Sequence, residues 1–331
     1  MRAPAVARVP QVPQVPHGLA RRPAPSAPPP DRSLETLLGA TLLGEPAVEI
    51  VDLSSPWATS TRTERMTLAD GRRVVVQRSV GGASARATIG RRIRLGRLLP
   101  AIAPWLPMPE VRGGEATGPR PFVVTGFVPG ISGRELLADN RGAAQLGRLM
   151  GELVAGLARV PTRGLRLGGT WGDPERLATA ADRWLNASAP DLGADGARAL
   201  ERLLRRLPRE LAGAVPVFAH GDLAPVNILV RDGAVVALLD FERARLAHPL
   251  FDAAWWRWIV RHHHPERSEA AGPAFLEAAG LEDSPATAKR LDLLAALQCL
   301  EMLRRARRAE ARHEWAARLL SVLDWAGNRD P

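Results

Sequence analysis

The chain has 331 residues, of which 46% are apolar, and its formal net charge is +10. This length allows two lobes with separate cores, and the apolar share is ordinary for a soluble globular protein. No run approaches the roughly 18–20 consecutive apolar residues of a membrane helix. The N-terminus also lacks the basic and then apolar pattern of a signal peptide, so we expect no membrane partner.

Arginine supplies almost all of the positive charge, since Lys289 is the only lysine among 45 basic residues. The arginines are spread along the chain without interleaved aromatic residues, which indicates a solvated basic surface rather than a nucleic-acid partner. A single cysteine, Cys299, excludes an internal disulfide and fits a reducing compartment, so we expect a cytoplasmic protein. Because Cys299 lies in a Leu-rich helical pattern, we expect a buried thiol and not a nucleophile.

The first part of the chain changes character twice. Residues 1–31 are rich in proline and predict a disordered, polyproline-like leader. Ser33 predicts the cap of a short helix that ends at about Leu43. The next pattern predicts a small β-rich lobe over residues 32–128. We expect its strands at 48–53, 61–68, 73–78 and 121–125, and an arginine-rich helix at about 83–99.

From about Ser132 the pattern becomes helical and remains so. The apolar spacing after Gly142 is that of a buried amphipathic helix. We therefore expect a C-terminal helical lobe over residues 129–331, with helices at 142–160, 197–211, 273–279, 286–308 and 314–325.

One hairpin inside this helical region carries the chemistry. An apolar run ends in His220, Gly221 and Asp222, and Asn227 opens a β-run five residues after the aspartate. An Asp-Gly turn at residues 232–233 reverses the chain, and a second β-run leads to Asp240. We expect Asp222, Asn227 and Asp240 to converge; the alternative is an ordinary hairpin whose polar residues cap turns. Phosphoryl transfer needs such a set, with a carboxylate for the hydroxyl proton and oxygen ligands for magnesium.

The order and spacing of these residues, with Asp240 followed by Phe241 and Glu242, resembles the aminoglycoside phosphotransferase and choline kinase families of small-molecule kinases. The resemblance implies an α+β fold of the two-lobe protein-kinase type, with a small β-rich N-terminal lobe and a larger helical C-terminal lobe. It implies ATP and Mg²⁺ as cofactors and a small-molecule hydroxyl as acceptor. It also implies Asp222 as the catalytic base, Asn227 and Asp240 as metal ligands, and His220 as structural support.

In the first lobe the chain departs from the family. The turn that would cover the ATP phosphates, residues 54–60, carries hydroxyls but no glycine. The family places a lysine on the third strand and a glutamate on the next helix, but this lobe contains no lysine and the helix no acid. Arg78 shares a strand face with two valines and is our candidate for nucleotide binding, with Gln77 if the register slips. The ion pair is missing unless Glu64 or another acid substitutes.

The resemblance also places the adenine contact where the two lobes are linked. By matching position, Thr125, Gly126, Phe127 and Val128 are candidates for backbone hydrogen bonds to the nucleotide base.

Downstream of the hairpin, three features have two interpretations each. Asp252 matches a family aspartate that opens a helix beneath the catalytic loop; it would support that loop, or simply favour the helix start. Trp255, Trp256 and Trp258 would form a cation–π wall for a quaternary amine, or pack in the core. The histidines at 262–264 look like a metal tract, but we prefer a solvated helix end.

Together these patterns predict an ATP- and Mg²⁺-dependent kinase that phosphorylates a small-molecule alcohol. An antibiotic is the first candidate acceptor, because the segments at 240–242 and 249–252 look most like antibiotic kinases. The basic charge disfavours aminoglycosides, and a neutral or anionic metabolite, a nucleoside antibiotic or a sugar is equally open. The alternative is a pseudokinase-like protein that binds a ligand or partner without turnover, as the missing Lys–Glu pair would allow.

Overall fold

The computed structural model describes residues 44–54, 61–79 and 82–327. The chain divides into two units, Met1–Pro46 and Ala47–Pro331, and every described helix and strand belongs to the second. Three predictions fall outside the described residues: the leader at 1–31, the helix at 33–43, and the turn at 54–60 apart from its first residue.

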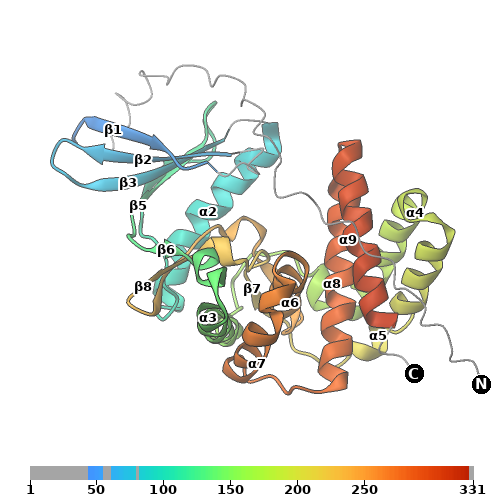
Figure 1. The fold of residues 1–331 in the computed structure, drawn as a ribbon. Coiled ribbons are helices and arrows are strands. Elements are labelled where there is room, and N and C mark those ends of the chain that lie inside the picture. Colours follow the sequence, from blue (N-terminus) through green and yellow to red (C-terminus); the bar gives the residue numbers. More distant parts are fainter. Residues whose placement is uncertain (1–43, 55–60, 80–81, 328–331) are drawn as a thin grey trace, which may run out of the picture. The chain divides into compact units, whose positions relative to one another are not determined.

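The N-terminal part of the second unit is an antiparallel sheet in the strand order β1-β2-β3-β5-β4 (Figure 1). Its cross-strand pairs place Val76 beside Glu64 on one neighbouring strand and beside Val124 on the other. All three side chains are buried, so one sheet face forms the first core. The strands are Ala47–Asp52 (β1), Thr61–Leu68 (β2), Arg73–Ser79 (β3), Val111–Glu115 (β4) and Phe122–Gly126 (β5).

Two elements of this part differ from expectation. The helix α2, Gly82–Ile102, is longer at both ends than the arginine pattern indicated. Strand β4 was not assigned from sequence, because two adjacent glycines at 113 and 114 weaken its β signal. A bulge near Gly113 shifts its register, and Gly114 gives Ile93 of α2 the room to approach.

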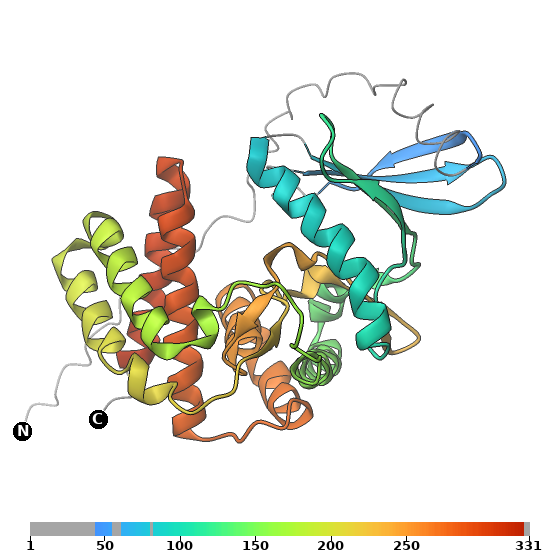
Figure 2. The same ribbon diagram turned by 180° about the vertical axis from the view of Figure 1, so that it is seen from behind.

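The remainder is mainly helical (Figures 1 and 2). Asp139, Asp173 and Ser284 start three of the helices, since each side chain accepts a hydrogen bond from a backbone N–H of the first turn. The helices are Asn140–Ala158 (α3), Pro174–Leu204 (α4), Leu207–Glu210 (α5), Phe251–His263 (α6), Ser268–Ala278 (α7), Pro285–Arg305 (α8) and Ala309–Gly327 (α9). Short 3₁₀-helices occur at 133–138, 170–172, 225–227, 241–243 and 265–267.

Short strands complete the fold. Ile228–Arg231 (β8) pairs with Ala234–Leu238 (β9) and with Ile131–Ser132 (β6). Val217–Ala219 (β7) pairs with Arg245–Ala247 (β10). A β-sheet region followed by a helical region gives the α+β class and the kinase-like arrangement that the sequence predicted.

The helical part has a continuous apolar core. Helix α8 is buried along the whole stretch 291–301, and Cys299 lies within it as expected. Burial raises the pKa of the Cys299 thiol, which keeps it protonated and unreactive. None of the helices in the described ranges combines the length and hydropathy that crossing a bilayer requires.

Helices α3 and α7 pack with almost no space between their backbones. A Cβ at Gly147 would collide with the carbonyl oxygen of Ala271, and a Cβ at Gly151 would lie 2.5 Å from the carbonyl oxygen of Phe275. Both contacts are with backbone, so a larger side chain forces the helices apart. The close approach therefore depends on glycine at these positions.

We expect Gly147→Ala to lower the free energy of unfolding, because overpacking of about 1–3 kcal/mol or more exceeds the gain in helix propensity. Gly156→Ala in the same helix is the matched control, since its Cβ would make an ordinary contact of 3.6 Å with Trp105. The control should be more stable than the wild type by about 0.5–1 kcal/mol. Equilibrium unfolding in urea measures both, and a Gly147→Ala protein as stable as the control contradicts the packing argument.

Candidate active site

The site begins where β7 ends. Strand β7 is buried and delivers the chain to His220. Gly221 has a φ of +86°, and a Cβ there would collide with the carbonyl oxygen of Arg243. Only glycine fits this turn, which leaves the side chain of the next residue, Asp222, half-buried at the surface of the site.

A carboxylate from another element holds this turn in place. Asp252, in the first turn of α6, accepts hydrogen bonds from the backbone N–H of His220 at 2.7 Å and of Gly221 at 2.9 Å. Burial raises the pKa of Asp252, while the nearby His220 and the two hydrogen bonds oppose that rise. Asp252 therefore fixes the backbone immediately before Asp222 and does not itself reach solvent.

His220 connects the two halves of the site. Its Nε2 is 2.7 Å from the carbonyl oxygen of Leu239, and its Nδ1 accepts a hydrogen bond from the backbone N–H of Asp222 at 3.3 Å. Nε2 is therefore the protonated nitrogen, donating to Leu239. The ring also packs edge-on against Phe241, with 4.8 Å between centroids. Since the side chain is buried and both nitrogens are engaged, His220 acts as a support between the loop and the hairpin.

Asn227 is held beside Asp222 and Asp240. Its Nδ2 donates to the carbonyl oxygen of Asp222 at 2.8 Å, so its side-chain oxygen remains as the atom for a ligand. The backbone carbonyl oxygen of Asn227 accepts a hydrogen bond from the backbone N–H of Leu239, also at 2.8 Å, and Leu239 immediately precedes Asp240. The turn at 232–233 has φ values of 52° and 79°, the left-handed pair that a tight hairpin needs.

Asp240 closes the set in a strained conformation. Its φ of 63° is left-handed, which is uncommon for a residue other than glycine and is frequent at functional sites. Burial raises the pKa of the neighbouring Glu242, and the negative charges of Asp240 and Asp222 add to the rise. Glu242 therefore lies within electrostatic reach of both aspartates.

These groups fit a magnesium ion that arrives with a nucleotide. The donors are oxygens: the carboxylates of Asp240 and Glu242 and the free amide oxygen of Asn227. Across the described ranges no group of three His, Cys, Asp or Glu side chains is placed to hold a metal by itself. Mg²⁺ does not need such a cage, because it commonly binds one or two carboxylates together with water and substrate phosphates.

On β3, Arg78 has an acidic partner from the adjacent strand. Its guanidinium forms an ion pair with Glu64 of β2, a side chain that is only 1% exposed. The other oxygen of Glu64 forms an ion pair with the Nε of Arg62 at 3.0 Å. The acid that α2 lacks is thus supplied by β2, one of the alternatives that the sequence left open. Gln77 contacts Thr63 instead.

Sequence reasoning missed the arginines of α2 as part of the site. Arg92 donates to Asp240 at 2.6 Å and to Glu242 at 3.0 Å, although it is only 8% exposed. Arg91 donates to the carbonyl oxygens of Glu242 and Ala244. A signal was present, because Arg92 follows Ile89 by three residues and so lies on the apolar stripe of the helix.

The four candidates for contact with the nucleotide base, residues 125–128, differ in how far the sheet already uses their backbone groups. The backbone N–H of Gly126 donates to Glu110, and that of Phe127 donates to Arg73, so sheet pairing uses both. Thr125 pairs with Val75 inside the sheet. Among the described residues Val128 has no backbone hydrogen-bond partner, which makes it the candidate best able to contact a nucleotide base.

The tryptophans of α6 are buried, and one of them contacts the site. Trp256 stacks on Phe275 in the core at 4.3 Å between centroids, whereas Trp255 stacks on Trp258. The Nε1–H of Trp255 donates to the Oδ1 of Asp222 at 2.8 Å, a contact that the sequence did not suggest. This hydrogen bond orients the carboxylate.

The histidine tract at the end of α6 does not form one of the groups of three side chains that could hold a metal ion, since the described part of the chain has none. His262 stacks on Trp258 with 5.2 Å between centroids, so it packs against the helix instead of extending into solvent. Burial lowers its pKa. The expectation of a solvated helix end was therefore wrong for His262.

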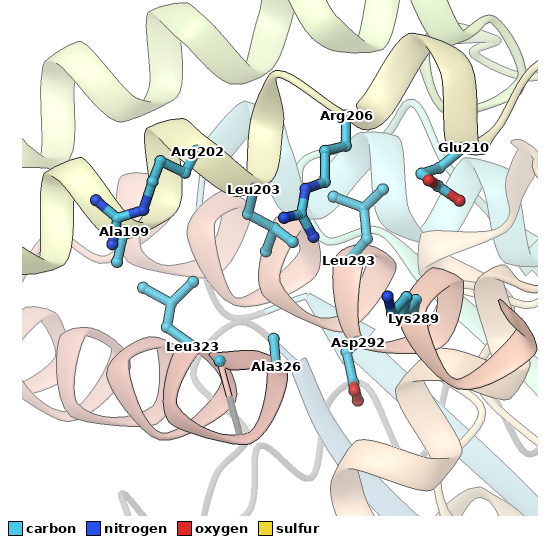
Figure 3. Close-up of a pocket in the computed structure, with 11 residues that line it drawn as sticks. Ala199, Arg202, Leu203, Arg206, Glu210, Lys289, Asp292, Leu293, Leu323 and Ala326 are labelled. Atoms are coloured by element: carbon cyan, nitrogen blue, oxygen red, sulfur yellow. The ribbon is translucent and has the colours of Figure 1, made fainter. Parts of the chain in front are cut away.

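A separate pocket of about 130 Å³ lies among α4, α5, α8 and α9 (Figure 3). It contains none of the sequence-predicted site residues. Its lining combines basic and acidic side chains with leucine and alanine, namely Ala199, Arg202, Leu203, Arg206, Glu210, Lys289, Asp292, Leu293, Leu323, Ala326 and Gly327. Asp292 also pairs with Arg257 of α6 at 2.6 Å.

The chain is similar to known proteins in both sequence and fold. The sequence matches the model of the phosphotransferase enzyme family over residues 56–291, which is more than half of the chain. None of the curated proteins compared matches the chain.

Among solved structures, the fold is similar to the GDP and kanamycin complex of APH(2")-IIia, with a TM-score of 0.68, 14% identity, and coverage of 90% of this chain and 99% of that one. A thermostable mutant of aminoglycoside phosphotransferase APH(4)-Ia, in a ternary complex with AMP-PNP and hygromycin B, has a TM-score of 0.68, 17% identity, and coverage of 90% of this chain and 98% of that one. Macrolide 2'-phosphotransferase MphH from Brachybacterium faecium has a TM-score of 0.62, 21% identity, and coverage of 87% and 97%. At these identities the likeness is one of fold.

We expect Asp252→Ala to lower the free energy of unfolding by about 2–5 kcal/mol, because it leaves two buried backbone N–H groups unpaired. Asp252→Asn should lose less, since its side-chain oxygen still accepts one hydrogen bond. Asp283→Ala, at an exposed position, is the control and should change stability by less than about 0.5 kcal/mol. Urea unfolding of the three variants is the measurement, and equal stability of Asp252→Ala and the wild type would refute the role of Asp252.

Proposed function

The chain belongs to the phosphotransferase enzyme family, and we propose that it transfers the γ-phosphoryl group of ATP to a hydroxyl of a small molecule, with Mg²⁺ as cofactor. The observation that carries this proposal is the network that brings Asp222, Asn227 and Asp240 together. Hydrogen bonds from Asn227 to the backbone of Asp222 and from Leu239 to the backbone of Asn227 support the proposal, because they join the segments that carry the three residues.

In the proposed reaction, Asp222 is the base. Trp255 occupies its Oδ1, so the Oδ2 atom is left to accept the proton of the acceptor hydroxyl. The hydroxyl oxygen then forms a bond to the γ-phosphorus, the bond to the β–γ bridging oxygen breaks, and ADP leaves. Most of the acceleration in such reactions comes from positioning and charge neutralisation, so the precise orientation of Asp222 matters more than its basicity.

The nucleotide would be held from both sides. Asn227 and Asp240 would hold Mg²⁺, which neutralises phosphate charge when bound. Arg78, fixed by Glu64 and 13% exposed, would donate to phosphate oxygens from the sheet. Val128 would pair with the base through its unused backbone groups.

Our choice of acceptor class rests on the similar folds and on the net charge of the chain. Similar folds belong to proteins described with kanamycin and hygromycin B and to a macrolide phosphotransferase. The formal charge of +10 repels polycationic substrates at long range. We therefore propose a neutral or weakly charged hydroxyl compound, with a macrolide as the first antibiotic to test and kanamycin as the polycationic comparison. The single buried cysteine is compatible with action in the cytoplasm.

The test is product formation from γ-labelled ATP, Mg²⁺ and a panel of hydroxyl compounds. We expect Asp222→Asn to reduce turnover about 10²–10⁴-fold, the usual contribution of a positioned base. Asp232→Asn is the matched control, because Asp232 is exposed in the turn and asparagine tolerates its left-handed backbone.

Equal product from Asp222→Asn and the wild type would overturn the assignment of the base. If the wild type binds no nucleotide and forms no product with any acceptor, the proposed activity fails. The alternative of a ligand- or partner-binding protein without turnover would then be favoured.

We expect Trp255→Phe to lower kcat by about 10-fold or more with little change in the KM for the nucleotide. The hydrogen bond from Trp255 orients the carboxylate of Asp222, and without it the carboxylate is free to rotate away from the acceptor hydroxyl. Steady-state kinetics of the variant and the wild type measure the effect.

Trp258→Phe is the control for this prediction. It removes a similar buried ring from the same stack, but among the described residues the Nε1 of Trp258 has no hydrogen-bond partner. A loss of kcat of the same size in both variants would show that the effect comes from packing and not from the hydrogen bond to Asp222.

A further inference from the structure

Helix α2 places a positively charged arginine at the site, whereas kinases place a negatively charged glutamate on the corresponding helix. A glutamate on this helix would pair with the cation on β3, but that cation, Arg78, already pairs with Glu64. The helix instead presents Arg92 to the carboxylates of Asp240 and Glu242. The acid that pairs with the β3 cation thus comes from β2 and not from α2. Helix α2 supplies a cation instead, and this cation, Arg92, contacts Asp240, which we propose as a metal ligand.

Arg92 is buried against these two carboxylates. Its side chain is 7% exposed, and its only hydrogen-bond partners among the described residues are the two carboxylates, both reached by Nη2. The Nε and Nη1 atoms are buried without partners among the described residues, so the ion pairs with Asp240 and Glu242 are what hold the guanidinium. Arg91, the preceding residue, ties the helix to the backbone of Glu242 and Ala244.

The guanidinium uses part of the metal-binding capacity of the site. Arg92 lies 2.6 Å from the Oδ1 of Asp240, which is the distance of a charge-assisted hydrogen bond. The Oδ2 of Asp240 and the amide oxygen of Asn227 remain for a metal. A divalent ion on Oδ1 would stand next to a buried fixed cation, and the repulsion between like charges is strong in such surroundings.

We propose that Arg92 takes the place of one of the two magnesium ions that protein kinases hold between the corresponding aspartate and asparagine. The site then binds a single divalent ion with the nucleotide, held by Asp240 Oδ2 and Asn227, and Arg92 supplies the second positive charge permanently. This inference rests on the proposed function, since it concerns how the same site binds a nucleotide.

The test counts metal ions and does not depend on turnover. Protein in excess over a non-hydrolysable ATP analogue is titrated with Mn²⁺, and electron paramagnetic resonance measures free Mn²⁺ to give the number bound per nucleotide. We expect one Mn²⁺ for the wild type and two for Arg92→Met, in which Oδ1 of Asp240 is released. Arg92→Lys keeps a cation and should bind one.

Arg97→Met is the matched control, because Arg97 is exposed on the same helix, and it should also bind one Mn²⁺. Circular dichroism and urea unfolding establish that each variant is folded. Two ions bound by the wild type would overturn the proposal whether or not the variants fold, and one ion bound by a folded Arg92→Met protein would overturn it as well.

Failure of the proposed function gives a different result. In that case the wild type binds no nucleotide analogue at any Mn²⁺ concentration, and the inference falls with it. Binding of the analogue with two ions instead leaves the proposed function standing and removes only the role of Arg92.

Discussion

The geometry of the site depends on one buried carboxylate. Asp252 accepts the backbone N–H groups of His220 and Gly221, and without it these donors would be buried and unpaired. The interaction joins α6 to the loop after β7, two elements that are distant in the chain. Because α6 also carries Trp255, the same helix sets both the backbone before Asp222 and the orientation of its side chain. A rigid element thus supports the group that would react.

The second organising feature is the distribution of buried charge. Glu64 is 1% exposed and forms ion pairs with Arg62 and Arg78, while Arg92 joins helix α2 to Asp240 and Glu242. Buried ion pairs contribute little net stability, but removing one partner is costly because the other remains as an uncompensated charge. The two sets of ion pairs therefore act mainly by fixing the positions of the arginines. Arg78 lies within the sheet, on β3, and Arg92 lies against the carboxylates that follow the β8–β9 hairpin.

Aromatic packing has two distinct uses in α6. Trp256 faces Phe275 and fills the core, whereas Trp255 and Trp258 form a stack that ends at Asp222. Neither arrangement leaves an open aromatic wall, since the three rings are at most 6% exposed. A cation–π site for a quaternary amine therefore finds no support here, and the core interpretation accounts for Trp256.

The sequence by itself determined the α+β class, four strands of the first sheet and helices α2, α3 and α8 to within a few residues, and the hairpin that carries Asp222, Asn227 and Asp240; the helix expected at 197–211 is in fact the end of α4 followed by α5. These are local properties: alternation, helical spacing, an Asp-Gly turn, and a motif within about twenty residues. Strand β4 escaped because its glycines weaken a short pattern. Only the tertiary structure decided which arginine meets which acid. Arg92 and Asp240 are 148 residues apart in the chain, and nothing in either local pattern encodes their contact. The pairing of Arg78 with Glu64 depended likewise on strand register, and the hydrogen bond from Trp255 to Asp222 on the rotation of α6. Side-chain partners follow from how elements pack, whereas local sequence patterns specify the elements themselves.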